Sequence, residues 1–387
     1  MAKRARSANR PPQRHLYLIF DDWSWGYSIR KTSLPSDDEE AAEAEANNVT
    51  IDRTEQPTPP AIFRLAAPAP RGAAAASCFV AGFGTMIMVM HARSPKDDVR
   101  LLVPKRLVPA FDVRDRGIFF APRPEADPAH SIYIPVGDGR IFALSTRSGS
   151  FELLEQSPRP EPGGNGGGLG SSSWRKLPDP PFEPKCVVTS YAVHPDGRIF
   201  LSVEGTTRGT FSFPTTEVED STGTGDETFA WERHGDWILP FFGLAQFDSE
   251  LNAWVGFSRY PYIGHLCSCD VPSARTTQPA DDGQCPAWKV GKEKLFAVDP
   301  DERHIGFTLV YMGGRSRYCL VQCVYKYKDD RKQPSLQCRF LLRVTTFYLK
   351  YEKNGDLTTG YSRNVRYYRV PDATTEAILK NPVAFWM

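Results

Sequence analysis

A tryptophan returns at a constant interval through the middle of the chain. Trp174 begins the segment WRKLPDPPF, Trp231 begins WERHGDWILPF and Trp288 begins WKVGKEKLF, so successive copies stand 57 residues apart. The pentapeptide DGRIF occurs at 138–142 and again at 196–200, an offset of 58 residues. Two independent markers thus agree on nearly one period, and a fixed period of this size is typical of repeat proteins.

Each repeat is expected to consist of short β-strands. Asp138-Gly139 and Asp196-Gly197 each lie between two apolar runs, and Asp-Gly supplies the positive φ that a tight hairpin turn requires. Most of the remaining chain consists of short β-prone runs that Gly, Pro, Asp and Asn interrupt. The 33 Pro and 30 Gly agree with many turns. The best helix candidate is 373–379, with Asp372 as its N-cap, and a short helix over 38–46 is an alternative to a mobile segment there.

The repeats together predict the fold. Equivalent segments stand one and two periods before Phe142 and one and two periods after Phe200, which gives six units of about four strands each. Strand repeats of this kind are typical of β-propeller blades, which bury their faces against one another. We therefore predict an all-β protein that forms a single β-propeller, with six blades of about four short antiparallel strands. Two packed β-sandwiches are the alternative, but they do not explain a Trp every 57 residues.

The propeller interpretation makes two further predictions. The recurring Trp would lie near the last strand of a blade and pack against the next blade. A strand from 15–20 or 365–370 would join the first blade to the last and so protect the open sheet edges.

The chain is expected to divide into three parts. Residues 1–14 are rich in Lys and Arg and are expected to be a disordered basic tail. Residues 15–371 would form the propeller, and 372–387 a C-terminal segment with the short helix. Inside the propeller, 34–60 is acidic and contains Pro, and 156–173 contains GGNGGGLGSSS. Such compositions disfavour a packed core, so both segments are expected to be mobile insertions.

Charge and hydropathy exclude several protein classes. The chain has 47 Lys+Arg and 46 Asp+Glu, a net charge of +1, so it lacks the basic excess typical of nucleic-acid binding. No run approaches the roughly 20 apolar residues of a membrane helix, and the first 15 residues lack the apolar stretch of a secretory signal. The eight thinly spread Cys are expected to be reduced thiols. A soluble protein of the cytoplasm or nucleus, without a membrane partner, is predicted.

One group of residues resembles a metal site. His265, Cys267 and Cys269 stand at alternate positions and would project from one face of a strand, with Cys285 further along the chain. Structural zinc needs four ligands, and its cysteines are usually separated by two to four residues rather than one. Free cysteine is also among the most buried residue types, so core packing explains the same pattern. We predict core packing here, with no metal and no cofactor.

No catalytic residue is predicted. The chain lacks the Gly-x-Ser-x-Gly elbow of a serine hydrolase, and its Gly-rich segment lacks the Lys of a phosphate-binding loop. Asp21-Asp22 and Asp329-Asp330 are sequence neighbours that would point apart on a strand, whereas catalytic carboxylates face each other across a substrate. They are expected to be turn or surface charges, and His194 an exposed turn residue.

Two stretches combine aromatic and basic residues. Tyr325-Lys326-Tyr327-Lys328 and Arg366-Tyr367-Tyr368-Arg369 contain residue types that stack on bases and neutralise phosphates. A strand with one solvated face has the same composition. Without a net basic charge, nucleic acid is ranked low as a partner.

Over nearly the whole chain, from His15 to Met387, the sequence also resembles a plant family that is numerous in grasses and known only as domain of unknown function 1668. The segments that carry the resemblance are LYLIFDDWSWGYSIRK, FDVRDRGIFFAPRP, IYIPVGDGRIFAL, WRKLPDPPF, YAVHPDGRIF, HLCSCDV, LVYMGG and VRYYRVP. The rhythm of turn, strand and Trp is similar to that of kelch-type propellers, although the double-Gly kelch signature is largely missing. The resemblance implies one repeated domain and supplies no catalytic residue.

Two functions remain open at this point. The first is a non-enzymatic, kelch-like interaction scaffold, a monomer whose loops bind a partner protein. The second is a hydrolase-like propeller enzyme with polar residues converging on the mouth of the central channel. A pocket lined by Asp, Glu or His from at least three blades would favour the enzyme. A shallow surface with aromatic side chains and mixed charge would favour the scaffold.

Overall fold

The fold is known from a computed structural model. It describes residues 13–35, 49–66, 77–91, 106–125, 127–137, 139–155, 173–216, 229–272, 285–296, 299–326, 339–360 and 363–387. These residues form an all-β protein of small, mainly antiparallel sheets. The expected basic tail and the expected insertion at 156–173 lie almost wholly outside the described residues.

The first three sheets have four strands each, and we number them in chain order. The first sheet has the strand order β27 (Val383–Trp386), β1 (Leu16–Trp23), β2 (Gly26–Thr32) and β4 (Ala61–Ala66). The second consists of β5 (Cys78–Gly82), β6 (Met86–Met90), β7 (Leu107–Asp112) and β8 (Ile118–Pro122). The third consists of β9 (Ser131–Val136), β10 (Arg140–Ser145), β11 (Phe151–Glu155) and β12 (Trp174–Lys176), with the 3-10 helix η1 (Pro128–His130) before it.

The remaining strands form three further groups. The fourth sheet consists of β13 (Val187–Val193), β14 (Arg198–Glu204), β15 (Gly209–Pro214) and β16 (Glu232–Gly235). The fifth consists of β17 (Phe241–Asp248), β18 (Ala253–Ser258), β19 (His265–Asp270) and β20 (Trp288–Lys294), and a parallel pairing of β13 with β17 joins it to the fourth. The sixth has the order β21 (Glu302–Gly313), β22 (Arg317–Lys326), β23 (Arg339–Tyr348), β26 (Arg363–Arg369) and β3 (Val49–Gln56). Beside them lie the short ladder of β24 (Lys350–Tyr351) with β25 (Leu357–Thr358) and the helix α2 (Glu376–Lys380).

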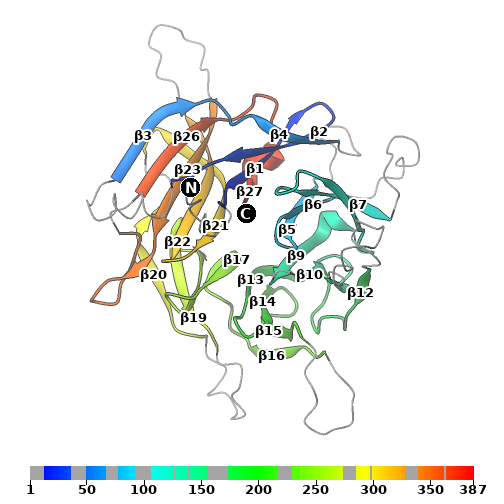
Figure 1. The fold of residues 1–387 in the computed structure, drawn as a ribbon. Coiled ribbons are helices and arrows are strands. Elements are labelled where there is room, and N and C mark those ends of the chain that lie inside the picture. Colours follow the sequence, from blue (N-terminus) through cyan, green and yellow to red (C-terminus); the bar gives the residue numbers. More distant parts are fainter. Residues whose placement is uncertain are drawn as a thin grey trace, which may run out of the picture.

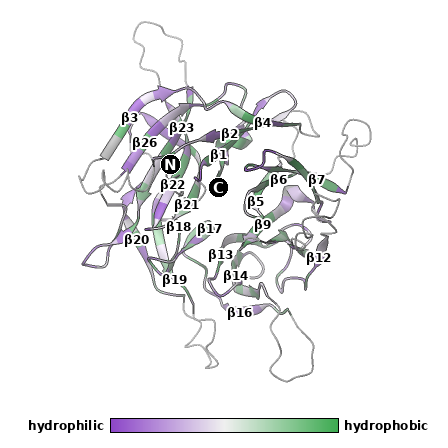
Figure 2. Cartoon of the chain, viewed as in Figure 1, coloured by the Kyte–Doolittle hydropathy of each residue, from purple (hydrophilic) through white to green (hydrophobic). Residues whose placement is uncertain are grey.

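The sheets lie around a common middle (Figure 1). The strands β5, β9, β13 and β17 are close to the middle, and β12, β16 and β20 are at the periphery. Figure 2 shows hydrophobic residues concentrated in the inner strands, whereas β12 and β16 are largely hydrophilic. The all-β fold of small antiparallel sheets is therefore confirmed.

The core is divided among the boundaries between sheets. A separate cluster of buried apolar side chains lies between each sheet and the next in chain order. Another cluster lies between the sixth sheet and the first, and it includes Leu16, Leu18, Val321 and Leu342. A four-stranded sheet has two apolar faces, and here both faces of each are covered by neighbours.

We call the boundary between the first and sixth sheets the seam. Here β27, at the end of the chain, pairs antiparallel with β1, with Leu16 opposite Trp386 and Ile19 opposite Val383. The segment 365–370, which we also considered for this position, does not pair with β1 but belongs to β26, which pairs with β23 on one side and with β3 on the other. The segment 15–20 does lie at the seam, as part of β1.

A second segment crosses the seam. The chain leaves the first sheet after β2, adds β3 in parallel to β26 at the edge of the sixth sheet, and returns to the first sheet as β4. The expectation of a mobile insertion over 34–60 therefore does not hold for Val49–Gln56. Further hydrogen bonds span the seam, from Arg317 Nη2 to the carbonyl oxygen of Pro35 (2.6 Å) and between Thr32 Oγ1 and the Tyr368 hydroxyl (3.2 Å).

Two of the repeated tryptophans occupy equivalent positions. Trp174 begins β12 and Trp231 directly precedes β16, so each enters the outermost strand of its sheet. The indole Nε1 of Trp174 donates to the carbonyl oxygen of Pro122 at 2.8 Å, and that of Trp231 to Pro178 at 3.0 Å. Both acceptors belong to the preceding sheet or follow its last strand. The expected packing against the next blade is therefore wrong in direction.

Two other tryptophans contrast with each other. Trp288 begins β20 but is 42% exposed, and its ring meets the edge of Tyr262. Trp254 of β18 is fully buried, and its Nε1 donates to the carbonyl oxygen of Val193 in the fourth sheet at 2.9 Å. A buried tryptophan contact between the fourth and fifth sheets therefore comes from outside the 57-residue series.

The turn and helix predictions differ in detail from the structure. Gly197 has φ +90°, as a tight turn requires, but in the earlier copy the positive φ belongs to Gly137 rather than Gly139, and Asp138 lies outside the described residues. The helix begins at Glu376 with Thr375 as N-cap, not after Asp372. Among the described residues, we find no helix with the length and hydrophobicity needed to span a membrane.

Trp254→Phe should lower the free energy of unfolding by about 2 to 4 kcal/mol, because it leaves a void and a buried carbonyl without its donor. Urea unfolding followed by circular dichroism measures the change. Trp288→Phe is the matched control and should cost less than about 0.5 kcal/mol, since this ring is largely exposed. Equal losses in the two variants would contradict the described packing.

Candidate interaction surface

One end of the fourth and fifth sheets exposes large apolar side chains. Tyr260 is 86% exposed, Val187 63% and Phe242 62%, and the neighbouring Ile263, Tyr262 and Leu244 are exposed as well. We call Val187, Phe242, Leu244, Tyr260, Tyr262 and Ile263 the β17 surface. Single exposed apolar residues are ordinary, but a group of them in one region marks an interaction site.

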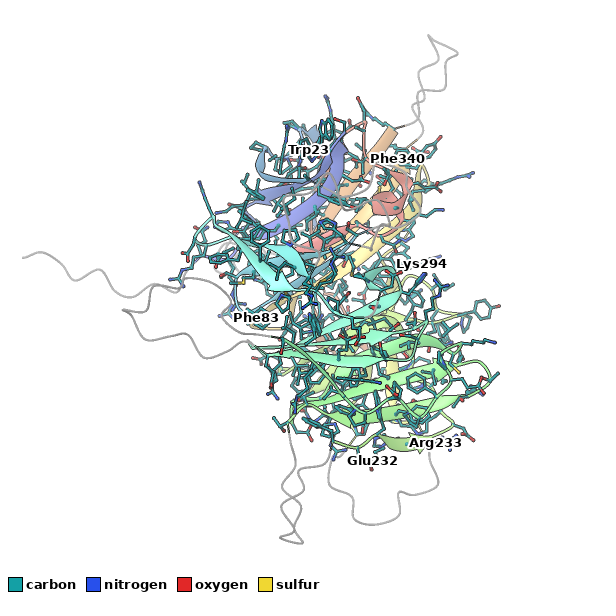
Figure 3. All side chains as sticks on the ribbon, turned by 90° about the vertical axis from the view of Figure 1, so that its right-hand side faces the viewer. Trp23, Phe83, Glu232, Arg233, Lys294 and Phe340 are labelled. Atoms are coloured by element: carbon teal, nitrogen blue, oxygen red, sulfur yellow. The ribbon has the colours of Figure 1, made fainter. Side chains whose placement is uncertain are left out.

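Backbone pairing brings these residues to the same end of two sheets. Val187 begins β13, and Phe242 stands near the beginning of β17, which runs parallel to β13. The other exposed aromatic residues lie in the connection from β18 to β19, which returns to the same end. Figure 3 places Lys294, at the end of β20, on the same side of the molecule as Phe340 of the sixth sheet and opposite Phe83. The surface is therefore built on two paired strands and one short connection.

The connection between β18 and β19 is held by its own backbone. The amide of Arg259 donates to Pro240 at 3.1 Å, that of Tyr262 to Arg259 at 2.9 Å, and that of His265 to Tyr262 at 3.1 Å. Gly264 has φ +90°, and a Cβ there would meet the Phe296 ring, so this turn requires glycine. The tyrosines are therefore presented by an ordered turn, which lowers the entropy lost on binding.

Charges border the apolar residues. The Arg259 guanidinium pairs with Glu204 at 2.6 Å, and about a third of each side chain is exposed. This pair ties the β18–β19 connection to the end of β14, directly opposite Val187 in the ladder. Exposed aromatic residues accompanied by charged and polar groups are the usual composition of a protein interface.

The predicted metal candidates lie close by but serve the core. Cys267 and Cys269 of β19 are buried in the cluster between the fourth and fifth sheets, as core packing requires. Burial raises the pKa of the Cys267 thiol to about 12 and also raises the pKa of Cys285. His265 Nδ1 lies 2.9 Å from the carbonyl oxygen of Gly291. The described residues contain no group of three or more His, Cys, Asp or Glu arranged to hold a metal ion.

The other predicted polar residues have structural contacts. Asp21 is buried and accepts a hydrogen bond from the Thr375 amide (2.9 Å), and Asp22 pairs with Arg30. The expectation of surface charges is wrong for these two, and Asp329-Asp330 lies outside the described residues. His194 is only 9% exposed, with Nε2 3.0 Å from the carbonyl oxygen of Pro272, so its prediction as an exposed turn residue is wrong.

The described residues of the aromatic–basic stretches do not form a stacking surface. Tyr367 and Tyr368 are buried on opposite faces of β26, one in a cluster within the sixth sheet and the other at the seam. Tyr325 packs on Phe340 with ring centroids 5.4 Å apart, and Tyr327-Lys328 lies outside the described residues.

Sequence reasoning missed one nucleophile–base pair. Ser77 precedes β5 and His91 follows β6, and Ser77 Oγ lies 2.7 Å from His91 Nδ1. Burial, together with the charge of Arg123, lowers the pKa of His91 to about 3. An imidazole of such low basicity is a poor general base at neutral pH. No sequence motif could reveal the pair, because only the hairpin brings these residues together.

A buried charged cluster between the fifth and sixth sheets was also missed. Glu302 and Arg343 are both almost fully buried and lie 3.4 Å apart (Oε2 to Nη1). His304 stacks on Phe296 with centroids 4.0 Å apart, and burial together with Arg343 lowers its pKa to about 4. The visible signal was Arg343 inside the apolar run RFLLRVTTFY, because a buried charge requires a partner.

Small antiparallel sheets around a common middle, with cores between the sheets, define a propeller-like all-β protein. The chain belongs to the family described as "Protein of unknown function (DUF1668)", whose model matches residues 13–368. No curated protein matches it.

Several solved structures are similar in fold over most of their length. A chain of the nidogen/laminin complex is 10% identical, with 96% of this chain and 98% of that chain covered and a TM-score of 0.45. Hsv2 of Kluyveromyces lactis is 9% identical, with coverages of 92% and 94% and a TM-score of 0.39. A putative 6-phosphogluconolactonase of Bacteroides fragilis is 11% identical, with coverages of 94% and 99% and a TM-score of 0.37.

The low pKa of His91 predicts an acid-sensitive fold. As the pH falls from 6.5 towards 3, the unfolded chain binds a proton that the folded His91 does not, so stability decreases by at most about 1.4 kcal/mol per pH unit from this residue. His91→Gln should therefore lose less stability between pH 6.5 and 4.5 than the wild type. Urea unfolding at each pH measures this, and parallel pH curves for the two proteins would contradict the assignment.

Proposed function

We propose that the chain is a closed β-propeller of six blades and acts as a non-enzymatic, kelch-like protein-interaction scaffold. The closed ring is supported by the pairing of β27 with β1 and by the apolar cluster that joins the sixth sheet to the first. The six blades are supported by the six groups of strands, of which the fourth and fifth are linked by the β13–β17 pairing.

The β17 surface is the proposed binding site. The observation that carries the proposal is the exposure of Tyr260, Phe242 and Val187 on paired strands and an ordered turn. Tyrosine is enriched among residues that dominate binding energy, because it buries a large area with few rotatable bonds. A rigid scaffold with such residues is suited to recognise a partner protein rather than a small molecule.

The proposal includes the setting in which the protein works. The protein works in plant cells, as a monomer in the cytoplasm or nucleus. Its partner is another protein rather than a nucleic acid or a membrane. The overall charge of +1 supports the ranking against nucleic acid.

A hydrolase-like propeller enzyme is the second candidate. The specific observation in its favour is the distance of 2.7 Å between Ser77 Oγ and His91 Nδ1 at the inner strand of the second sheet. The low pKa of His91 weighs against it, because the imidazole would gain a proton from serine only at high energetic cost.

The test compares two double variants as baits for affinity capture from plant tissue. Phe242→Asp/Tyr260→Asp places two charges on the β17 surface, and Ile118→Asp/Phe120→Asp places two charges on exposed apolar residues of β8. We expect the first variant to lose at least tenfold of the specifically enriched protein, since hot-spot residues contribute about 2 kcal/mol or more. The second variant should retain it.

Two results would overturn the proposal. If both variants retain the same enriched protein, the β17 surface is not the binding site. If the wild type enriches no protein but hydrolyses ester substrates, and Ser77→Ala abolishes the turnover, the protein is an enzyme.

A further inference from the structure

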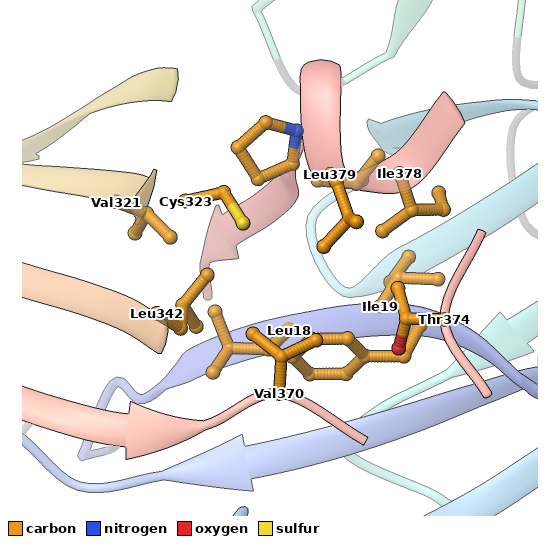
Figure 4. A pocket seen from close by; sticks show the side chains of 12 residues that line it. Leu18, Ile19, Val321, Cys323, Leu342, Val370, Thr374, Ile378 and Leu379 are labelled. Atoms are coloured by element: carbon orange, nitrogen blue, oxygen red, sulfur yellow. The ribbon is translucent and has the colours of Figure 1, made fainter. Parts of the chain in front are cut away.

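A small apolar pocket lies at the seam, beneath α2 (Figure 4). It is lined by side chains from β1, β22, β23 and the C-terminal segment, among them Leu18, Cys323, Leu342, Ile378 and Leu379. Such a gap forfeits dispersion contacts between the surrounding side chains. The C-terminal segment therefore rests on a part of the core that is less well packed than its surroundings.

Residues 371–387, which we call the C-terminal latch, are attached by few elements. The four residues of β27 pair with β1, two backbone hydrogen bonds between Met387 and His15 continue this pairing, and α2 has only five residues. The Thr375 side chain does not cap α2 and instead bonds Asp21. Short elements at a sheet edge separate at lower free energy than the long strands of the sixth sheet.

The latch also contains an unfavourable polar group. The hydroxyl of Thr374 lines the pocket and is buried without a hydrogen-bond partner among the described residues. A buried hydroxyl without a partner costs about 1 to 3 kcal/mol. This cost is relieved when the latch moves away and the hydroxyl meets water.

A thiol lies directly beneath the latch. Cys323 of β22 is 1% exposed and faces Leu379 across the pocket, and burial raises its pKa to about 12. While the latch is closed, Cys323 is thus both inaccessible and protonated. Residues of the latch line the pocket beside this thiol, whereas the ladder of β21, β22 and β23 includes no residue of the latch.

We infer that the C-terminal latch opens as a local unit while the sheets remain folded, and that this opening exposes Cys323 as a cryptic thiol. This opening at the seam is independent of the β17 surface on the fourth and fifth sheets. A reagent or protein that modifies thiols reaches Cys323 in the open state only.

The test measures maleimide labelling of the native full-length protein at neutral pH, resolved cysteine by cysteine by mass spectrometry. Cys267 is the matched control, because it is equally buried and its pKa is also raised to about 12, but it lies between the fourth and fifth sheets. We expect Cys323 to be labelled at least tenfold faster than Cys267.

Two variants shift the latch in opposite directions. Gly306→Ala drives a methyl group into the Lys380 carbonyl of α2 and should raise the labelling rate of Cys323 at least tenfold. Thr374→Val keeps the shape of the side chain, removes the unpartnered hydroxyl and should lower that rate at least threefold. Neither variant should change the labelling rate of Cys267.

The inference is overturned if Cys323 and Cys267 are labelled at equal rates and both rates change by the same factor in each variant. Only global unfolding would then expose either thiol. If Gly306→Ala does not fold, Thr374→Val and amide hydrogen exchange of the wild type decide. Exchange of 376–387 must be faster than that of 253–258 in β18, and equal protection of the two segments contradicts the latch.

Discussion

The apolar packing of the first sheet against the sixth is the contact on which the arrangement of the other sheets depends. Each small sheet has two apolar faces, and a chain of such sheets leaves one uncovered face at each end. The uncovered faces here are those of the first and sixth sheets, and they bury each other at the seam. The crossing of β3 into the sixth sheet adds a second tie at the same boundary. Both ties join residues more than 300 positions apart in the sequence.

The repeat pattern of the sequence was sufficient for the architecture of small sheets but not for their junctions. Trp174 and Trp231 mark equivalent positions because each must fill the gap to a neighbouring sheet. The strand that pairs with β1 at the seam could not be predicted, because VAFW at 383–386 is as short and apolar as many other segments. The composition of 34–60 did not indicate β3 for a similar reason. The stability of this strand comes from pairing with β26 rather than from its own apolar residues.

The contacts of the polar residues were harder to predict from the sequence than the fold. The choice of core packing over zinc for Cys267 and Cys269 rested on ligand spacing, a local property, and their places in the core agree with it. Ser77 with His91 and Glu302 with Arg343 are pairs across strands, which only the register of the sheets brings together. The β17 surface was equally hidden, because Tyr260 and Phe242 become neighbours only when β17 pairs with β18.

The long separation of β27 from β1 along the chain has a consequence during protein synthesis. The first sheet leaves the ribosome early, but its strand β27 is made some 360 residues later. At translation rates of about 5 to 20 residues per second, Leu16, Leu18 and Phe20 remain uncovered for roughly 20 to 70 s. During this interval the nascent chain carries an exposed apolar face, and chaperones that bind such faces have that time in which to act.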